Sequence, residues 1–235
     1  MELILDKIEK SFGSKSVLRG ASFAFRQGRM YGLLGRNGAG KTTLMNCLSG
    51  EIPADSGSAV LTGADGAPHP LTEEDVGYVL STPVVPEFLT GYEFVKFFRE
   101  IKGDPSGRSI DDWFELIHLD PEDRHRLMKD YSHGMKSKMQ MLCFLIARPP
   151  VILLDEPLTS FDVVAALEMK NLLREMKEDH IILFSTHILQ LAADLCDEIV
   201  VLSQGVLEEV DPAVIHTKEF EERIIDLLKD EEHHD

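Results

Sequence analysis

The sequence predicts an α/β fold in which helices cover a largely parallel β-sheet. The first observation is a compact apolar strand at residues 30–34 that runs through a glycine-rich loop into the helical composition of residues 42–48. Strand, glycine loop and helix is the order that a phosphate-binding turn requires. The second is an alternation of strand-like and helical segments between residues 151 and 202.

Short apolar runs separated by glycines occupy the first thirty residues, a pattern that predicts short strands joined by turns. Two more strand-like runs follow the phosphate-binding turn, at residues 58–61 and 76–80. The N-terminal runs are residues 3–5, 17–18 and 23–25, and the glycines are Gly13, Gly20 and Gly28.

Helical periodicity begins at Gly91, after which apolar residues recur three or four positions apart. Residues 112–119 and 134–147 also predict helices, and Pro149 limits the second one, because the residue before a proline avoids the helical region. We therefore expect an inserted α-helical subdomain at residues 83–148.

Strands and helices alternate again after this insertion, which predicts β-α-β units in the same sheet as the first strand. The expected strands are residues 151–154, 181–184 and 199–202, and the expected helices are residues 163–177 and 189–196.

These segments predict a single domain of residues 1–235. Its α/β core, with the N-terminal strands, takes residues 1–82 and 149–218, and the helical subdomain takes residues 83–148. An acidic tail takes residues 219–235, where apolar residues at helical spacing predict a short surface helix.

The composition excludes several classes of protein. With 41 acidic and 24 basic residues the formal net charge is −17, which argues against a nucleic-acid partner. No apolar run approaches the ~20 residues of a membrane-spanning helix, and the N-terminus does not resemble a secretory signal. Three widely spaced cysteines are more typical of free thiols than of disulfides. We expect a cytoplasmic protein.

Residues 35–42 match the phosphate-binding pattern G-x-x-x-x-G-K-[ST] in full. Glycines let backbone N–H groups converge on phosphate oxygens at a helix N-terminus. Lys41 is expected to reach the β- and γ-phosphates and Thr42 to ligate Mg²⁺. The predicted nucleotide-binding residues of this loop are Gly35, Arg36, Asn37, Gly38, Ala39, Gly40, Lys41, Thr42 and Thr43.

A second motif is an apolar strand that ends in two carboxylates, at residues 151–156. The carboxyl ends of parallel strands form the edge where α/β proteins bind ligands. Asp155 is suited to hold the metal through water, and Glu156 to act as the general base on the attacking water.

Together these motifs resemble the ATP-binding-cassette (ABC) ATPases, in the family's order and spacing from about residue 2 to about residue 210. The resemblance implies a P-loop NTPase (RecA-like) core with an N-terminal antiparallel β-subdomain and an inserted helical subdomain. The family's signature, usually L-S-G-G-Q, reads Y-S-H-G-M-K at residues 131–136. By this resemblance, Ser132 and Gly134 complete the nucleotide site of a second subunit in a head-to-tail dimer.

Further residues take roles from the same resemblance. Asp162 lies in a D-loop at the dimer interface, His187 is the switch histidine that contacts the γ-phosphate, and Phe12 stacks on adenine. One position departs from the family: Ser81 stands where a metal-binding glutamine is usual, and its shorter side chain reaches the metal only through water.

The resemblance implies an ATP- and Mg²⁺-dependent ATPase that drives a separate polytopic membrane permease. It would then lie peripherally on the inner face of the cell membrane. The signature is similar to that of bacterial export-type ATPases, which favours an exporter. Two alternatives remain open: a non-transport ABC ATPase, in assembly for example, and a regulatory cassette that binds ATP without turnover. The residues do not distinguish a homodimer from a heterodimer, nor do they identify the transported molecule.

Overall fold

The computed structural model describes residues 1–63, 66–80, 82–104, 106–157 and 163–210, without the side chains of 163–166 and 168–169. Ser81, Asp162 and the predicted tail helix lie outside the described residues. None of the described helices has the length and apolar character needed to cross a membrane.

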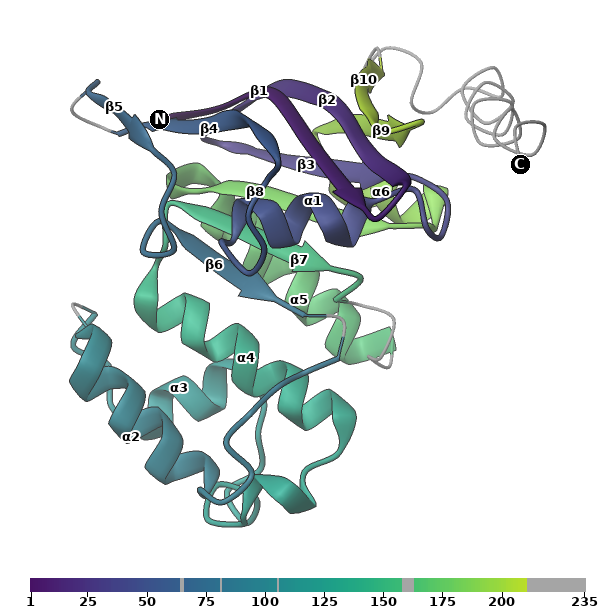
Figure 1. Ribbon diagram of the computed structural model, residues 1–235. Coiled ribbons are helices and arrows are strands. Elements are labelled where there is room, and N and C mark those ends of the chain that lie inside the picture. The colour runs from purple at the N-terminus through teal and green to yellow at the C-terminus, as the bar shows by residue number, and fades with distance from the viewer. Residues whose placement is uncertain (64–65, 81, 105, 158–162, 211–235) are drawn as a thin grey trace.

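Two sheets form the core (Figure 1). A six-stranded sheet has the order β10-β9-β3-β8-β7-β6, with β10 antiparallel to β9 and the other pairs parallel. Its strands are β3 (Arg29–Leu34), β6 (Val76–Val79), β7 (Val151–Asp155), β8 (Ile181–Thr186), β9 (Glu198–Ser203) and β10 (Val206–Val210). Every residue of β7, β8 and β9 is buried, as expected for parallel strands covered on both faces.

The second sheet is antiparallel and has the order β2-β1-β4-β5. Its strands are β1 (Glu2–Phe12), β2 (Lys15–Arg26), β4 (Ser56–Thr62) and β5 (Pro68–Pro70). β1 and β2 are longer than expected, and Gly20 does not form a turn: it lies inside β2 with φ of 94°, where the register shifts opposite Ile8 and Glu9. A bulge of this kind needs the left-handed freedom of glycine.

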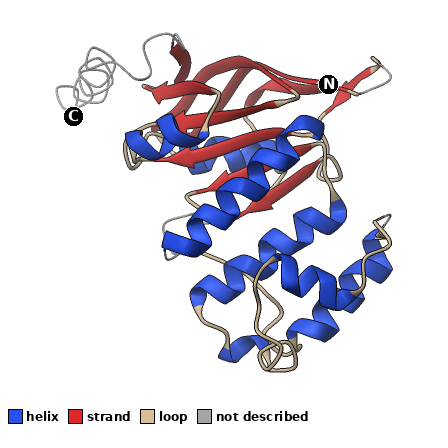
Figure 2. Ribbon diagram, turned by 180° about the vertical axis from the view of Figure 1, so that it is seen from behind, coloured by secondary structure: helices blue, strands red, loops and turns tan. Residues whose placement is uncertain are grey.

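Helix α1 (Lys41–Leu48) lies between the two sheets, where Leu44, Met45 and Leu48 join the core that contains Leu153 and Leu183. Helices α5 (Val163–Met176) and α6 (Leu189–Leu195) cover the opposite face of the six-stranded sheet (Figure 2). The parallel core is thus shielded from water on both faces.

Three helices pack around a separate core that includes Trp113, Phe114 and Met139. They are α2 (Gly91–Lys102), α3 (Ile110–Leu116) and α4 (His133–Ala147). Helix α3 ends three residues earlier than expected, whereas α4 ends before Pro149 as predicted. Phe144 of α4 instead joins the core under β6 and β7, so α4 links the helical unit to the sheet.

Candidate nucleotide-binding site

The glycine-rich loop between β3 and α1 has a backbone that only glycine adopts readily. Gly38 and Gly40 have φ angles of 87° and 105°. A Cβ on Gly35 would lie 2.8 Å from the carbonyl oxygen of Leu202. No side chain caps the N-terminus of α1, where Gly40 is the N-cap residue. The loop therefore has the geometry of an anion-binding turn at a helix N-terminus.

Lys41 begins α1 and turns back onto the loop. Its Nζ donates hydrogen bonds to the carbonyl oxygens of Gly35, at 2.7 Å, and Arg36, at 3.1 Å. The residue is only 6% exposed. A positive charge is therefore held beside the turn.

An open cavity of about 410 Å³ lies over this loop, within the size range of small-ligand sites. Gly35 and Ala39 of the predicted set are not among its described lining residues. Gly35 instead packs against the Leu202 carbonyl, and the N–H of Ala39 donates to the carbonyl oxygen of Arg36 within the loop. The cavity is lined by Phe12, Lys15, Val17, Arg36, Asn37, Gly38, Gly40, Lys41, Thr42, Thr43, Asp155 and Glu156.

Asp155, at the end of β7, is 4% exposed and is held by two hydroxyl groups. Thr42 Oγ1 donates to its Oδ2 at 2.8 Å, and Ser185 Oγ donates to its Oδ1 at 2.5 Å. Since β7 lies beside β8 in the sheet, the pairing of Asp155 with Ser185 follows from the register of these strands. One carboxylate oxygen thus faces the phosphate-binding helix and the other faces β8.

Glu156 follows directly and has a left-handed backbone, with φ of 49°. Its N–H donates to both the carbonyl oxygen and the Oγ of Ser185, at 3.2 and 3.1 Å. Its Oε1 lies 2.9 Å from Nδ1 of His187, just beyond the end of β8. A non-glycine residue in this conformation costs of order 1 kcal/mol, so the surrounding contacts have to enforce it.

Phe12 ends β1 at the cavity rim and is 52% exposed. Lys10 Nζ lies 5.7 Å from the centre of its ring and donates to Asp55 and to the carbonyl oxygen of Pro53. Asp55 also accepts from the N–H of Ser11, and the Lys10 hydrogen bond is the main cause that lowers the pKa of Asp55. The Phe12 ring therefore lies beside the ion pair of Lys10 and Asp55, and its exposed face is suited to stack on a base.

Tyr78 of β6 also carries a buried hydroxyl. Burial raises the pKa of Tyr78, and the negative charges of Asp155 and Glu51 raise it further. Its hydroxyl has no hydrogen-bond partner among the described residues. Tyr78 therefore stays protonated within β6, the strand that leads to Ser81.

The signature residues lie on the helical unit, away from the described lining of this cavity. Ser132 is the N-cap of α4, and its Oγ accepts from the N–H of Met135 at 3.2 Å. Helices α2 and α3 instead have capping boxes with Glu93 and Asp112 as the third residue. The first turn of α4, which includes Gly134, has no acidic residue, so no carboxylate there opposes an anion.

The donor set fits Mg²⁺. Hard divalent cations of this size take oxygen ligands and keep several waters and phosphate oxygens. Thr42 and Asp155 present one hydroxyl and one carboxylate side by side at the phosphate-binding turn. Among the described residues, no group of three or more His, Cys, Asp or Glu side chains is arranged to hold a metal ion without other ligands.

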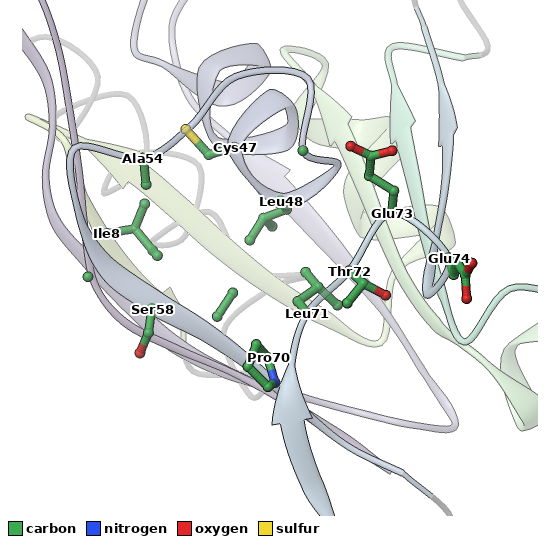
Figure 3. A pocket seen from close by; sticks show the side chains of 13 residues that line it. Ile8, Cys47, Leu48, Ala54, Ser58, Pro70, Leu71, Thr72, Glu73 and Glu74 are labelled. Atoms are coloured by element: carbon green, nitrogen blue, oxygen red, sulfur yellow. The ribbon is translucent and has the colours of Figure 1, made fainter.

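A larger cavity, of about 750 Å³, lies beside the C-terminal end of α1, at Cys47 and Leu48 (Figure 3). Ile8, Leu48 and Leu71 supply apolar walls, and Glu73 and Glu74 supply negative charge. The described lining contains no Lys or Arg, so this cavity is unsuited to a phosphate ligand despite its size.

Comparison with known proteins identifies the family, because the model of the ABC transporter family matches residues 18–159. The chain belongs to the ABC transporter family. It is an ATP-binding subunit of the type that this family pairs with membrane permeases. ATP-binding domains of ABC proteins are in general ATPases that bind ATP with Mg²⁺.

Individual ABC proteins align with most of this chain. The bacitracin transport ATP-binding protein BcrA of Enterococcus faecalis is 30% identical over 226 residues, 93% of this chain and 72% of BcrA. The sulfate/thiosulfate import ATP-binding protein CysA of Ralstonia nicotianae is 31% identical over 219 residues, 89% of this chain and 59% of CysA. A solved ATP-binding subunit of an ABC transporter superposes with a TM-score of 0.85 at 25% identity, covering 97% of this chain and all of that one. The predicted α/β fold with a P-loop core is thereby confirmed.

Some site residues of this ABC subunit escaped the sequence analysis. Ser185 contacts both Asp155 and Glu156, but a serine at the end of an apolar strand carries no signal of that contact. Lys15 and Val17 line the cavity because β2 runs beside the loop, which a motif search does not show.

Proposed function

We propose that this subunit hydrolyses ATP, dimerises head to tail around two Mg-ATP and drives a separate membrane permease, an exporter. The observation that carries the proposal is the pairing of Glu156 with His187 at 2.9 Å, next to the joined side chains of Thr42 and Asp155. In this proposal Glu156 is the base and His187 is the polar partner for the γ-phosphate. Thr42 and Asp155 form the metal-binding pair beside the phosphate loop.

The proposed reaction is in-line attack of water on the γ-phosphate, catalysed by positioning and charge stabilisation. The loop amides and Lys41 bind the phosphates, and Glu156 accepts the proton of the attacking water. His187 orients the Glu156 carboxylate and faces the γ-phosphate. Thr42 and Asp155 would hold Mg²⁺, which would supply neutralisation of phosphate charge.

Ser132 is proposed to act on the nucleotide of the partner subunit. As a cap its oxygen accepts from the Met135 N–H, which leaves its own proton able to donate to a phosphate oxygen. The N-terminus of α4 adds a favourable dipole for that anion. Asp162 in the D-loop and Ser81 near the metal are proposed on the family resemblance.

The permease is proposed to contact the helical unit, where large apolar side chains face the solvent. Val84 is 68% and Phe88 is 79% exposed, and Phe97 and Ile101 are also exposed. Exposed large apolar side chains of this kind suit contact with a protein partner. The export direction rests on the resemblance of the signature at residues 131–136 to export-type ATPases.

Steady-state ATPase assays test the central proposal. Glu156→Gln should reduce turnover by at least a hundredfold, because it removes the base. Glu208→Gln, an exposed substitution on β10, is the control and should leave turnover unchanged. Equal rates in the wild type and Glu156→Gln would remove the base assignment. ATP binding without turnover in the wild type would favour the regulatory cassette instead.

Sedimentation tests the dimer. Glu156→Gln should sediment as a dimer with Mg-ATP, and adding Ser132→Arg should return it to a monomer. A dimer that persists in the double variant would contradict the role of Ser132 across the interface.

Membrane pull-down tests the transport proposal. A polytopic membrane protein should co-purify with the wild type and not with Phe88→Asp. ATP-dependent uptake of its substrate into inverted vesicles would support export. Recovery of soluble assembly factors alone would support the non-transport alternative.

A further inference from the structure

Ser185 occupies a fully buried position between the two acidic residues of the site. The residue has no exposed surface, and its Oγ donates to Asp155 and accepts from the N–H of Glu156. Its carbonyl oxygen accepts from the same N–H. One serine therefore fixes a side chain of one acid and the backbone of the next.

The hydroxyl of Ser185 sets the direction of the Asp155 carboxylate. Oδ1 of Asp155 accepts the hydrogen bond from Ser185. Oδ2 therefore points toward the cavity, where it accepts from Thr42 at 2.8 Å. Without Ser185 the buried Oδ1 would lose its hydrogen bond, and the carboxylate would rotate to regain one. Buried polar atoms are costly when unpaired, so such rotation is expected.

The second contact of Ser185 holds Glu156 in its left-handed conformation. The N–H of Glu156 points back at Ser185, which directs the Glu156 side chain toward His187. Removing a residue that orients a metal-binding side chain typically lowers metal affinity by about 10–100-fold.

We propose that Ser185 is a positioning residue of this ATPase: its hydroxyl aims Asp155 at the metal position and locks Glu156 in place as the base. This inference rests on the proposed function, since it concerns the same site. It adds a residue that lies outside the phosphate loop, the signature and the acidic pair.

The test measures ATP binding, without turnover, in the Glu156→Gln background, by competition with a fluorescent ATP analogue in Mg²⁺ or in EDTA. Adding Ser185→Ala should reduce the Mg²⁺-dependent gain in ATP affinity by about tenfold. Affinity in EDTA should change by no more than about twofold. In the otherwise wild-type chain, Ser185→Ala should also lower kcat more than it raises KM.

Ser203→Ala is the matched control, because Ser203 is a buried serine at the end of β9, two strands away from β8. It should leave the Mg²⁺ gain within about twofold of the parent. Ser185→Cys keeps the size and a weak donor and should recover part of the gain. If Ser185→Ala lacks a cooperative thermal transition, Ser185→Val takes its place, because valine also lacks the hydroxyl and suits a strand. An unchanged Mg²⁺ gain in folded Ser185→Val would count against the inference.

An unchanged Mg²⁺ gain and kcat in folded Ser185→Ala, beside a wild type that hydrolyses ATP, would overturn the inference and leave the proposed function standing. Equal loss of ATP affinity in Mg²⁺ and in EDTA would also overturn it, because a general disturbance has that effect. A wild type that binds no ATP would overturn both.

Discussion

His187 and Glu156 meet across the ends of two neighbouring parallel strands, with His187 Nδ1 2.9 Å from Glu156 Oε1. The His187 side chain is 44% exposed and the Glu156 side chain 25%. Both side chains are therefore accessible from solvent, as the proposed attack of water on the γ-phosphate requires.

We expect His187→Ala to lower kcat by about a hundredfold, as loss of one donor to a charged transition state does. The affinity for ATP should change by less than about twofold, because the loop and Lys41 bind most of the nucleotide. His69→Ala is a matched control: its side chain is equally exposed and also lies near a carboxylate, Asp75, outside the site. The same fall in kcat in both variants would contradict the role of His187.

Phe12→Ala should weaken ATP binding by about tenfold, since stacking on a base contributes roughly 1–3 kcal/mol. Phe12→Trp should retain the affinity because it keeps an aromatic face. Titration with ATP measures both, and Phe88→Ala, another exposed phenylalanine, is the control. If Phe12→Ala binds ATP as the wild type does, the base does not stack there.

Gly77→Ala should destabilise the fold by about 1–3 kcal/mol, the usual cost of overpacking. A Cβ at Gly77 would approach Pro149 Cγ to 2.6 Å and the Phe144 ring more closely. Denaturant unfolding measures this loss. Phe144→Leu in the same chain should recover part of it by making room, whereas simple addition of the two single-variant costs would argue against the contact.

Acidification should destabilise the protein through His180, which is 2% exposed. Burial lowers the pKa of His180, and its Nε2 has no partner among the described residues. The unfolded chain therefore binds a proton more readily, so stability is full above about pH 6.5 and falls as the pH drops below it.

Unfolding free energies between pH 8 and pH 5 check this prediction. His180→Gln should show a smaller loss over that range, because the group that titrates is gone. His125→Gln, an exposed histidine on the helical unit, should retain the wild-type loss. A profile for His180→Gln that matches the wild type would place the pH dependence elsewhere.

Strong periodicity and glycine motifs made the parallel core predictable from the sequence. The strands that became β3, β7, β8 and β9 are continuous apolar runs, because each is buried on both faces. β10 was missed since only its last residue is buried, so its sequence V-L-E-E-V lacks an apolar pattern. β5 was missed because all three residues of P-H-P are exposed and the segment carries no strand signal.

The site was predictable where one short segment builds it, as in the loop that ends at Thr42. It was not predictable where the contact depends on strand register. Asp155 and Ser185 are 30 residues apart, and only the pairing of β7 with β8 brings them together. The left-handed backbone of Glu156 likewise has no sequence signal, because the residue type does not favour it.

Lys41 bears on how firmly this loop can retain a phosphate. The carbonyl oxygens of Gly35 and Arg36 accept hydrogen bonds from its ammonium group, so two backbone dipoles share that cation. Under the proposed function, the nucleotide phosphates share the same cation with these dipoles. Its attraction for the phosphate product is thereby moderated, which favours product release.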